Sequence, residues 1–367
     1  MDTVADTEQA PADNSGPAEN IDWGLAATIG KRVARPGPRV TRYTWERANA
    51  ELLDAAVRAE GPVREVTGLA DGLAVPTAQI LDRSGWIDAA SRSMPAMLAP
   101  VPSADEAENA SDDHRSGHGI SGKIAGVQAG GLLAFMSSAI LGQYDPFSVD
   151  PQTGQEGVLM LVAPNIIAVE RALRADPSDF RLWVCLHEVT HRVQFSANPW
   201  LADYMRSNVA SLTGTDDDSV ADLVGRVTES LRSGKQREKG VIGLMQLVQS
   251  PEQFESFERV LALGTLLEGH ADHVMDAVGP AHVPSVESIR AAFDQRRKGP
   301  KNPLQRLIRA LIGMDAKMAQ YVRGKAFVDH VVERVGMEQF NTIWTSPETM
   351  PLMAEIDQPD AWIERVL

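Results

Sequence analysis

The chain has 367 residues, of which 43% are hydrophobic and 23% are charged, a composition typical of a globular protein. Its 35 basic and 50 acidic residues give a formal net charge of −15, which argues against nucleic acid as a partner because phosphate binding needs concentrated positive charge. The single cysteine, Cys185, excludes an intrachain disulfide and a cysteine-based zinc site.

The N-terminus lacks the basic and apolar segments of a secretory signal, so we expect a cytoplasmic protein. Composition and hydrophobic periodicity divide the chain into five parts. These are an acidic disordered tail over 1–20, an N-terminal helical part over 21–102, a polar loop over 103–119, a part with a strand and a long helix over 120–200, and a helical part over 201–367.

In the N-terminal part, an amphipathic pattern predicts a helix over 44–59, and proline and glycine predict chain breaks at Pro36–Pro38 and at Gly61–Pro62. The weakly polar run over 124–141 contains Gln128, several glycines and two serines, which make it less apolar than a membrane-spanning helix. We therefore expect a buried, glycine-rich core helix there, and no membrane partner.

The next segments predict a strand and a helix. Gly142–Phe147 is typical of a turn, and Gly157–Ala163 gives the strongest strand signal of the chain. Asp176 fits the N-cap of a helix with Pro177 at its first position, and the helix continues to about Ala197. Because the remaining segments are almost wholly helical by pattern, the predicted fold class is mainly α with a small β-sheet (α+β).

This helix contains the sequence His187-Glu188-Val-Thr-His191. Residues four apart on a helix project from the same face, so both imidazoles are able to bind one Zn²⁺ ion. Glu188 lies about 100° further round the helix and is placed to take a proton from zinc-bound water, whose pKa the metal lowers. Buried polar groups without partners are costly, which favours one zinc ion per chain over two core histidines.

A catalytic zinc ion needs a third protein ligand and one open position. The apolar helical segment Leu266–Asp276 offers Glu268 and Asp272, which share one face, so that Glu268 binds the zinc while Asp272 orients a ligand histidine. His270 lies about 200° round the helix from Glu268, so the two cannot share one metal. His270 is therefore the alternative third ligand, and His273 is a further one.

These residues resemble the zincin superfamily of metallopeptidases, and the segment from Glu268 to Asp272 looks like the E-x-x-x-D motif of its gluzincin branch. The resemblance implies a zincin-like fold, with His187 and His191 as zinc ligands and Glu188 as general base. It also implies Glu268 as third ligand, with Asp272 supporting a ligand histidine.

Two features depart from the gluzincin pattern: Arg192 occupies a position that is usually uncharged, and the spacing from His191 to Glu268 is longer than is common. Three segments together resemble, more closely, a mainly actinobacterial family of uncharacterised zincin-like hydrolases, some of which are labelled as associated with deazaflavin coenzyme biosynthesis. The segments are LMLVAPNIIAVERAL, DFRLWVCLHEVTHRVQFSANPWL and LLEGHADHVMDAVG. The resemblance covers nearly the whole chain beyond the tail.

The predicted function is a zinc-dependent metallohydrolase, foremost a metallopeptidase that cleaves a peptide or related amide bond with zinc-bound water activated by Glu188. One alternative, motivated by Arg192 and the undecided third ligand, is a non-catalytic zincin scaffold that binds a partner and keeps a structural or vestigial metal. Another is a zinc amidase that acts on a small metabolite. The sequence gives no indication of the oligomeric state.

In zincins, a strand before the active-site helix forms the edge of the cleft and pairs with an extended substrate. Val158–Val162 is the candidate for this strand, although the same continuous apolar run also fits an inner strand. Stabilising the oxyanion of the reaction requires a hydrogen-bond donor facing the zinc, for which Tyr144, Tyr321 and His273 are the candidates.

Overall fold

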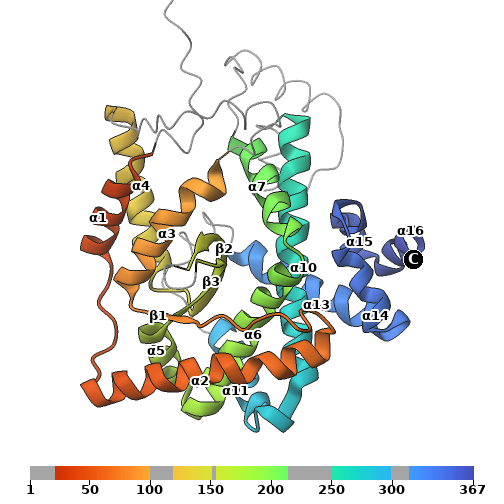
Figure 1. Cartoon of the computed structure of the whole chain (residues 1–367), viewed down its shortest axis with the longest axis horizontal. Coiled ribbons are helices and arrows are strands. Elements are labelled where there is room, and N and C mark those ends of the chain that lie inside the picture. Colours follow the sequence, from red (N-terminus) through yellow and green to blue (C-terminus); the bar gives the residue numbers. More distant parts are fainter. Residues whose placement is uncertain (1–20, 100–118, 151–153, 214–249, 299–313) are drawn as a thin grey trace, which may run out of the picture.

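The computed structural model describes residues 21–99, 119–150, 154–213, 250–298 and 314–367, and helices dominate these residues (Figure 1). The longer helices are α1 (Trp23–Val33), α2 (Arg42–Thr67), α3 (Arg83–Leu98), α4 (Ile120–Met136), α5 (Ala163–Leu173), α6 (Pro177–Ala197), α7 (Trp200–Thr213), α10 (Pro251–His282), α11 (Val286–Lys298) and α13 (Met314–Val335). Short helical segments close the chain: α14 (Met337–Phe340), η1 (Asn341–Trp344), η2 (Pro347–Thr349), α15 (Met353–Asp357) and α16 (Pro359–Val366). The predicted acidic tail and nearly all of the polar loop over 103–119 lie outside the described residues.

The described strands form one small sheet in the order β1-β3-β2, with bounds β1 (Gln79–Leu81), β2 (Gly142–Val149) and β3 (Glu156–Val162). β1 pairs with β3 in parallel, and β2 pairs with β3 antiparallel. The prediction that Val158–Val162 forms the cleft edge is wrong, because β3 is the central strand and is buried along most of its length. Its alternative, an inner strand, is confirmed. The edge strand with antiparallel pairing is β2.

The predicted turn over Gly142–Phe147 is also wrong, because these residues begin strand β2. The ladder with β3 is regular from Gly142 to Asp145 and then shifts register, so Pro146 lies in an irregular stretch where its missing N–H removes no ladder bond. The carboxylate of Asp145 accepts hydrogen bonds from the Phe147 amide at 3.0 Å and the Ser148 hydroxyl at 2.7 Å. Proline and aspartate are common in turns, so their presence on this edge strand led the sequence pattern to predict a turn.

Two helices differ from their predictions. α2 runs through the expected break at Gly61–Pro62; the glycine before the proline has no Cβ to clash with the proline ring, which removes one of the penalties of a proline inside a helix. α4 is glycine-rich as predicted but is not buried on all sides: Ile124 is 57% exposed. Glycines line much of its buried face because α1 approaches very closely: a Cβ on Gly130 would lie 2.6 Å from the carbonyl oxygen of Ala26.

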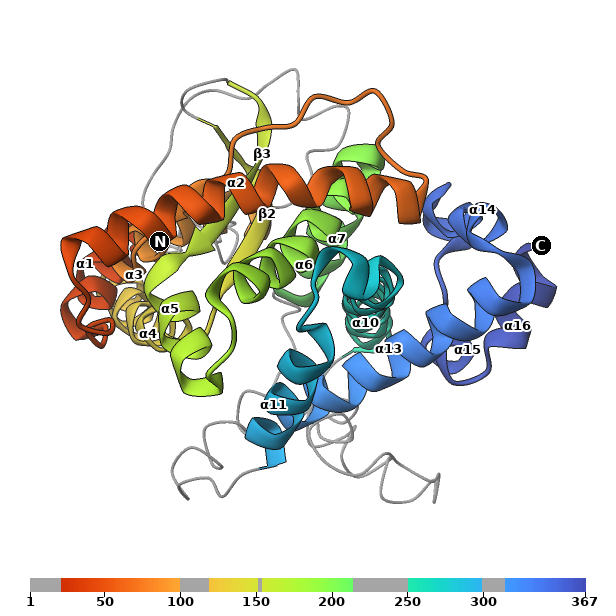
Figure 2. The same cartoon turned by 90° about the horizontal axis from the view of Figure 1, so that it is seen from below.

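The helices surround the sheet and two hydrophobic clusters. α2 lies along α6, and α10 packs against α6, α7 and α13, as Figure 2 shows from below. The sheet-side cluster joins buried residues of α2, β3, α5 and α6 with those at the end of α10 and in α11. The C-terminal cluster joins the middle of α10 with α13 and the last short helices. Together these observations confirm a mainly helical fold with a small sheet.

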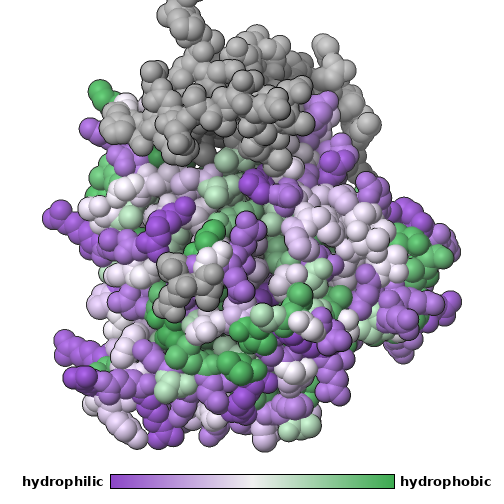
Figure 3. Space-filling model, viewed as in Figure 1, coloured by the Kyte–Doolittle hydropathy of each residue, from purple (hydrophilic) through white to green (hydrophobic). Residues whose placement is uncertain are grey.

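On the face seen in Figure 3, hydrophilic residues predominate and hydrophobic ones gather in patches between them. Across the described ranges, every helix is too short or too polar to span a lipid bilayer.

Candidate metal centre

Helix α6 forms as the sequence predicts. The side chain of Asp176 accepts hydrogen bonds from the backbone N–H groups of Ser178 at 2.9 Å and Asp179 at 3.0 Å, and Pro177 begins the helix. These contacts satisfy N–H groups that have no partner within the helix. The helix is buried along most of its length and therefore supports its polar side chains rigidly.

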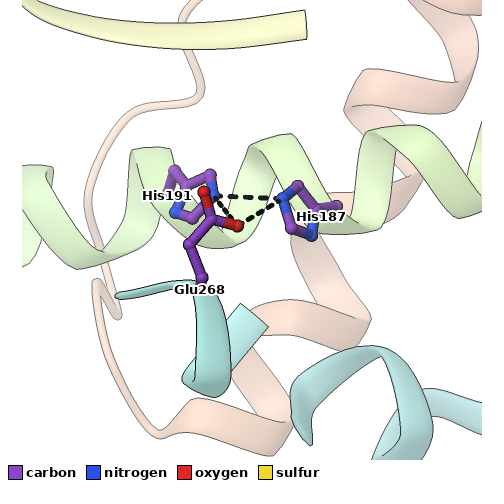
Figure 4. A group of neighbouring side chains, drawn as sticks. All are labelled: His187, His191 and Glu268. Carbon is purple, nitrogen blue, oxygen red and sulfur yellow. Dashed lines mark hydrogen bonds and ion pairs between the residues drawn. The ribbon is translucent and has the colours of Figure 1, made fainter. Parts of the chain in front are cut away.

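Three polar side chains from α6 and α10 converge at one point, as Figure 4 shows. The Nε2 atoms of His187 and His191 are 3.2 Å apart. The Oε2 atom of Glu268 lies 3.3 Å from Nε2 of His187 and 3.8 Å from Nε2 of His191. The structure therefore brings together the two histidines of α6 and the glutamate that the sequence favoured on α10.

These distances fit a zinc ion. With ligand bonds of about 2.0–2.1 Å, neighbouring donor atoms of a tetrahedral zinc site lie about 3.3 Å apart. The three donor atoms therefore occupy three corners of such a tetrahedron with little rearrangement. The side chains of His187, His191 and Glu268 are 21%, 14% and 22% exposed, so the group is only partly buried, although Oε2 of Glu268 itself is buried. A fourth position accessible from outside is what a catalytic zinc site requires.

Several ionisable side chains lie close together in the site and shift one another's pKa values. Burial disfavours the charged form of His187, but the neighbouring carboxylates, Glu268 foremost, together outweigh burial and raise the pKa of His187 to about 9. The charges of Glu188 and, to a smaller extent, Asp272 act in the same direction, while the role of Asp272 in orienting a ligand histidine stays a prediction. In the absence of metal, the carboxylates around His187 therefore favour a positive charge at this point of the structure.

Glu188 lies beside this cluster and is buried. Its side chain packs against Gly142 at the start of β2: a Cβ added to Gly142 would lie 2.6 Å from Cγ and 2.9 Å from Oε1 of Glu188. Burial raises the pKa of Glu188 to about 7, opposed by His187 and reinforced by Glu268. A carboxyl group with a pKa near neutrality is suited to both accepting and donating a proton.

The alternative third ligands have other contacts. The ring of His270 is fully buried and lies 5.4 Å from the ring of Phe340 and 5.3 Å from that of Trp344, measured between centroids. Nδ1 of His273 lies 2.7 Å from a carboxylate oxygen of Asp329 on α13. These rings are thus directed toward other parts of the structure, because helical periodicity turns both away from the face that carries Glu268.

The candidates for oxyanion stabilisation are described in part. The ring of Tyr144 packs against Phe195 with 5.9 Å between centroids, and its hydroxyl lies over Gly157 of β3. Burial raises the pKa of Tyr144 to about 12, which keeps the phenol protonated at neutral pH. The side chain of Tyr321 lies outside the described residues.

Arg192, the residue that departs from the gluzincin pattern, points away from the metal cluster. It is buried, pairs with the buried carboxylate of Glu60 on α2, and donates a hydrogen bond of 2.7 Å to the backbone oxygen of Pro76. Burial lowers its pKa to about 10, which leaves it charged at neutral pH. Arg192 thus joins α6 to α2 and does not disturb the site.

The sequence matches the family model of zincin-like metallopeptidases over residues 21–363. This chain belongs to the zincin-like metallopeptidase family. A crystal structure described as that of a candidate hydrolase with a novel fold, from Chloroflexus aurantiacus, is 30% identical in sequence, with a TM-score of 0.63 over 94% of this chain and 98% of that one. The curated proteins yield no match. The family implies zinc and supports a zinc metallohydrolase in general; the resemblance to mainly actinobacterial hydrolases stays a prediction.

In this member of the zincin-like family, two residues that contact the cluster or Glu188 were missed by the sequence reasoning. Gln194 contacts His191, and its position three residues along the same helix was a signal that could have found it. Gly142 packs on Glu188 from a strand far away in the sequence, and a lone glycine gives no signal of such a contact.

Proposed function

We propose that this chain is a zinc-dependent peptidase in which His187, His191 and Glu268 hold one zinc ion and Glu188 is the general base. The observation that carries the proposal is the convergence of two imidazole nitrogens and one carboxylate oxygen at separations of 3.2, 3.3 and 3.8 Å. Zinc prefers this combination of nitrogen and oxygen donors in catalytic sites.

When bound, the zinc ion supplies a Lewis acid that polarises the substrate carbonyl and makes water more acidic. Glu188 then takes a proton from the attacking water and delivers it to the nitrogen of the leaving amine. Its buried position and its contact with Gly142 restrict the carboxylate to one region beside the ligands. A restricted base is effective because the reacting groups are already in place.

The substrate in this proposal is an extended peptide that adds to the edge strand β2. Among the described strands, β2 pairs with β3 on one side only, and its first residue, Gly142, contacts the general base. A peptide paired along the other side of β2 would therefore pass Glu188. Main-chain hydrogen bonds would supply affinity, as in other cases of strand addition.

Elemental analysis of the purified protein tests the metal site. We expect about one zinc per chain in the wild type, loss of zinc in His187→Ala and Glu268→Ala, and retention in His270→Ala. Wild-type protein that takes up no zinc after reconstitution would refute the proposal and favour a binding scaffold.

Catalysis is tested with a peptide library and the variant Glu188→Gln, which keeps the size of the side chain and removes its basicity. We expect the variant to bind zinc like the wild type and to lose turnover. Equal behaviour of both proteins would indicate a non-catalytic scaffold. Turnover of small amides with no dependence on peptide length would instead indicate an amidase for a small metabolite.

A further inference from the structure

The side chain of Gln194 lies between the two helices that carry the proposed zinc ligands, and it is fully buried. Its Oε1 atom lies 2.9 Å from Nδ1 of His191. Its Nε2 atom lies 3.0 Å from the backbone oxygen of Leu267 and 3.0 Å from Nδ1 of His270. One side chain thus contacts a proposed ligand on α6 and the residue that immediately precedes Glu268 on α10.

The chemistry of these partners determines which way the amide of Gln194 faces. A backbone oxygen only accepts hydrogen bonds, so the atom that faces Leu267 must be the amide nitrogen. The amide oxygen therefore faces His191, and an oxygen accepts only from a protonated ring nitrogen. His191 must carry its proton on Nδ1, which leaves the lone pair of Nε2 directed toward His187 and Glu268.

His270 holds the amide in the same orientation. The second hydrogen of the Gln194 amide nitrogen points to Nδ1 of His270, which must accept and therefore carries its proton on Nε2. A reversed amide would place its oxygen against the backbone oxygen of Leu267, which can only accept a hydrogen bond.

We propose that Gln194 is a positioning residue that selects the metal-binding tautomer of His191 and fixes the distance between α6 and the turn of α10 that carries Glu268. The proposal rests on the zinc site proposed above. Hydrogen bonds to the second nitrogen of a ligand histidine orient the ring, and their loss typically weakens metal binding about 10- to 100-fold. Gln194 makes such a bond while also holding the helix of the third ligand.

The first test measures zinc affinity of the full chain by competition with a chromophoric chelator. Gln194→Met keeps the length of the side chain without its hydrogen bonds, and we expect it to bind zinc about 10- to 100-fold more weakly than the wild type. The matched control is Thr190→Val: Thr190 is equally buried on α6, but among the described residues its hydroxyl donates only to the backbone oxygen of Leu186 in its own helix, at 2.7 Å. We expect the control to bind like the wild type.

The second test identifies the protonated nitrogen of His191 by NMR of the metal-free protein labelled with ¹⁵N-histidine, at neutral pH. In the wild type we expect a proton on Nδ1. Gln194→Glu retains an acceptor for this proton and should preserve the tautomer, whereas Gln194→Met should release it. This readout would not respond to a loss of packing alone.

A wild type in which His191 carries its proton on Nε2 alone would overturn the proposal, even if the Gln194 variants fail to fold. Wild-type zinc affinity in Gln194→Met, with the proton still on Nδ1, would also overturn it. Absence of zinc binding in the wild type would instead refute the zinc site, while the tautomer measurement would still decide what Gln194 does.

Discussion

The contact between Gly142 and Glu188 gives a quantitative test of the general base. In Gly142→Ala, the new Cβ would lie 2.6 Å from Cγ and 2.7 Å from Cδ of Glu188. Carbon atoms in contact are about 3.5–4.0 Å apart, so the side chain of Glu188 must retreat by about 1 Å. Displacing a catalytic group by about 1 Å costs about 100-fold in rate. We therefore expect Gly142→Ala to lower kcat/KM about 100-fold.

The assay combines zinc analysis with turnover of a peptide selected from the library. Gly142→Ala should retain one zinc per chain, because Glu188 is not among the proposed ligands. Gly264→Ala is a matched control: Gly264 is exposed on α10, one turn before Glu268, and a Cβ there would meet no atom within 4 Å. It should leave both zinc content and turnover unchanged.

Undiminished turnover in Gly142→Ala would refute the assignment, since Glu188 could not then need the position that it occupies in the structure. Loss of zinc together with turnover would instead show that the strand supports the ligands themselves. Glu188→Gln sets the lower limit of activity against which the loss in Gly142→Ala is compared.

Three further predictions concern stability. Arg192→Leu leaves the buried carboxylate of Glu60 without its partner on α6, so we expect the free energy of unfolding in urea to fall by about 3 kcal/mol while zinc content is kept. Gly324→Ala would drive a Cβ into the backbone oxygen of Thr265 where α13 crosses α10, so chemical unfolding should show a loss of about 1–3 kcal/mol. Removing zinc with a chelator should lower Tm but leave the helical circular dichroism intact; free zinc at about 100 times its Kd should restore about 2.7 kcal/mol.

Much of the site could be predicted because its signals are local. The cap at Asp176, the four-residue spacing of His187 and His191, and the apolar surroundings of Glu268 all lie within single helices, where periodicity determines which side chains share a face. The choice of Glu268 over His270 followed from the same periodicity. The structure brings together His187, His191 and Glu268, the three residues that the helical geometry favoured.

The remaining features depend on contacts between distant segments. Pro146 and Asp145 suggested a turn, and only pairing with β3 makes this stretch an edge strand. Arg192 raised doubt about catalysis because its partner Glu60 lies on another helix and the sequence does not reveal the pairing. The proximity of Gly142 to Glu188 likewise follows from the fold alone.

The two helices that carry the proposed ligands are held by the core rather than by the metal. α10 contributes Leu263 and Leu266 to the C-terminal cluster and Val274 and Met275 to the sheet-side cluster, so the turn that bears Glu268 lies between two buried anchors. α6 is also fixed to both clusters, since Phe195 belongs to the C-terminal cluster while most of its buried residues belong to the other. Core packing therefore preorganises the three donor atoms, and zinc would bind without assembling the fold.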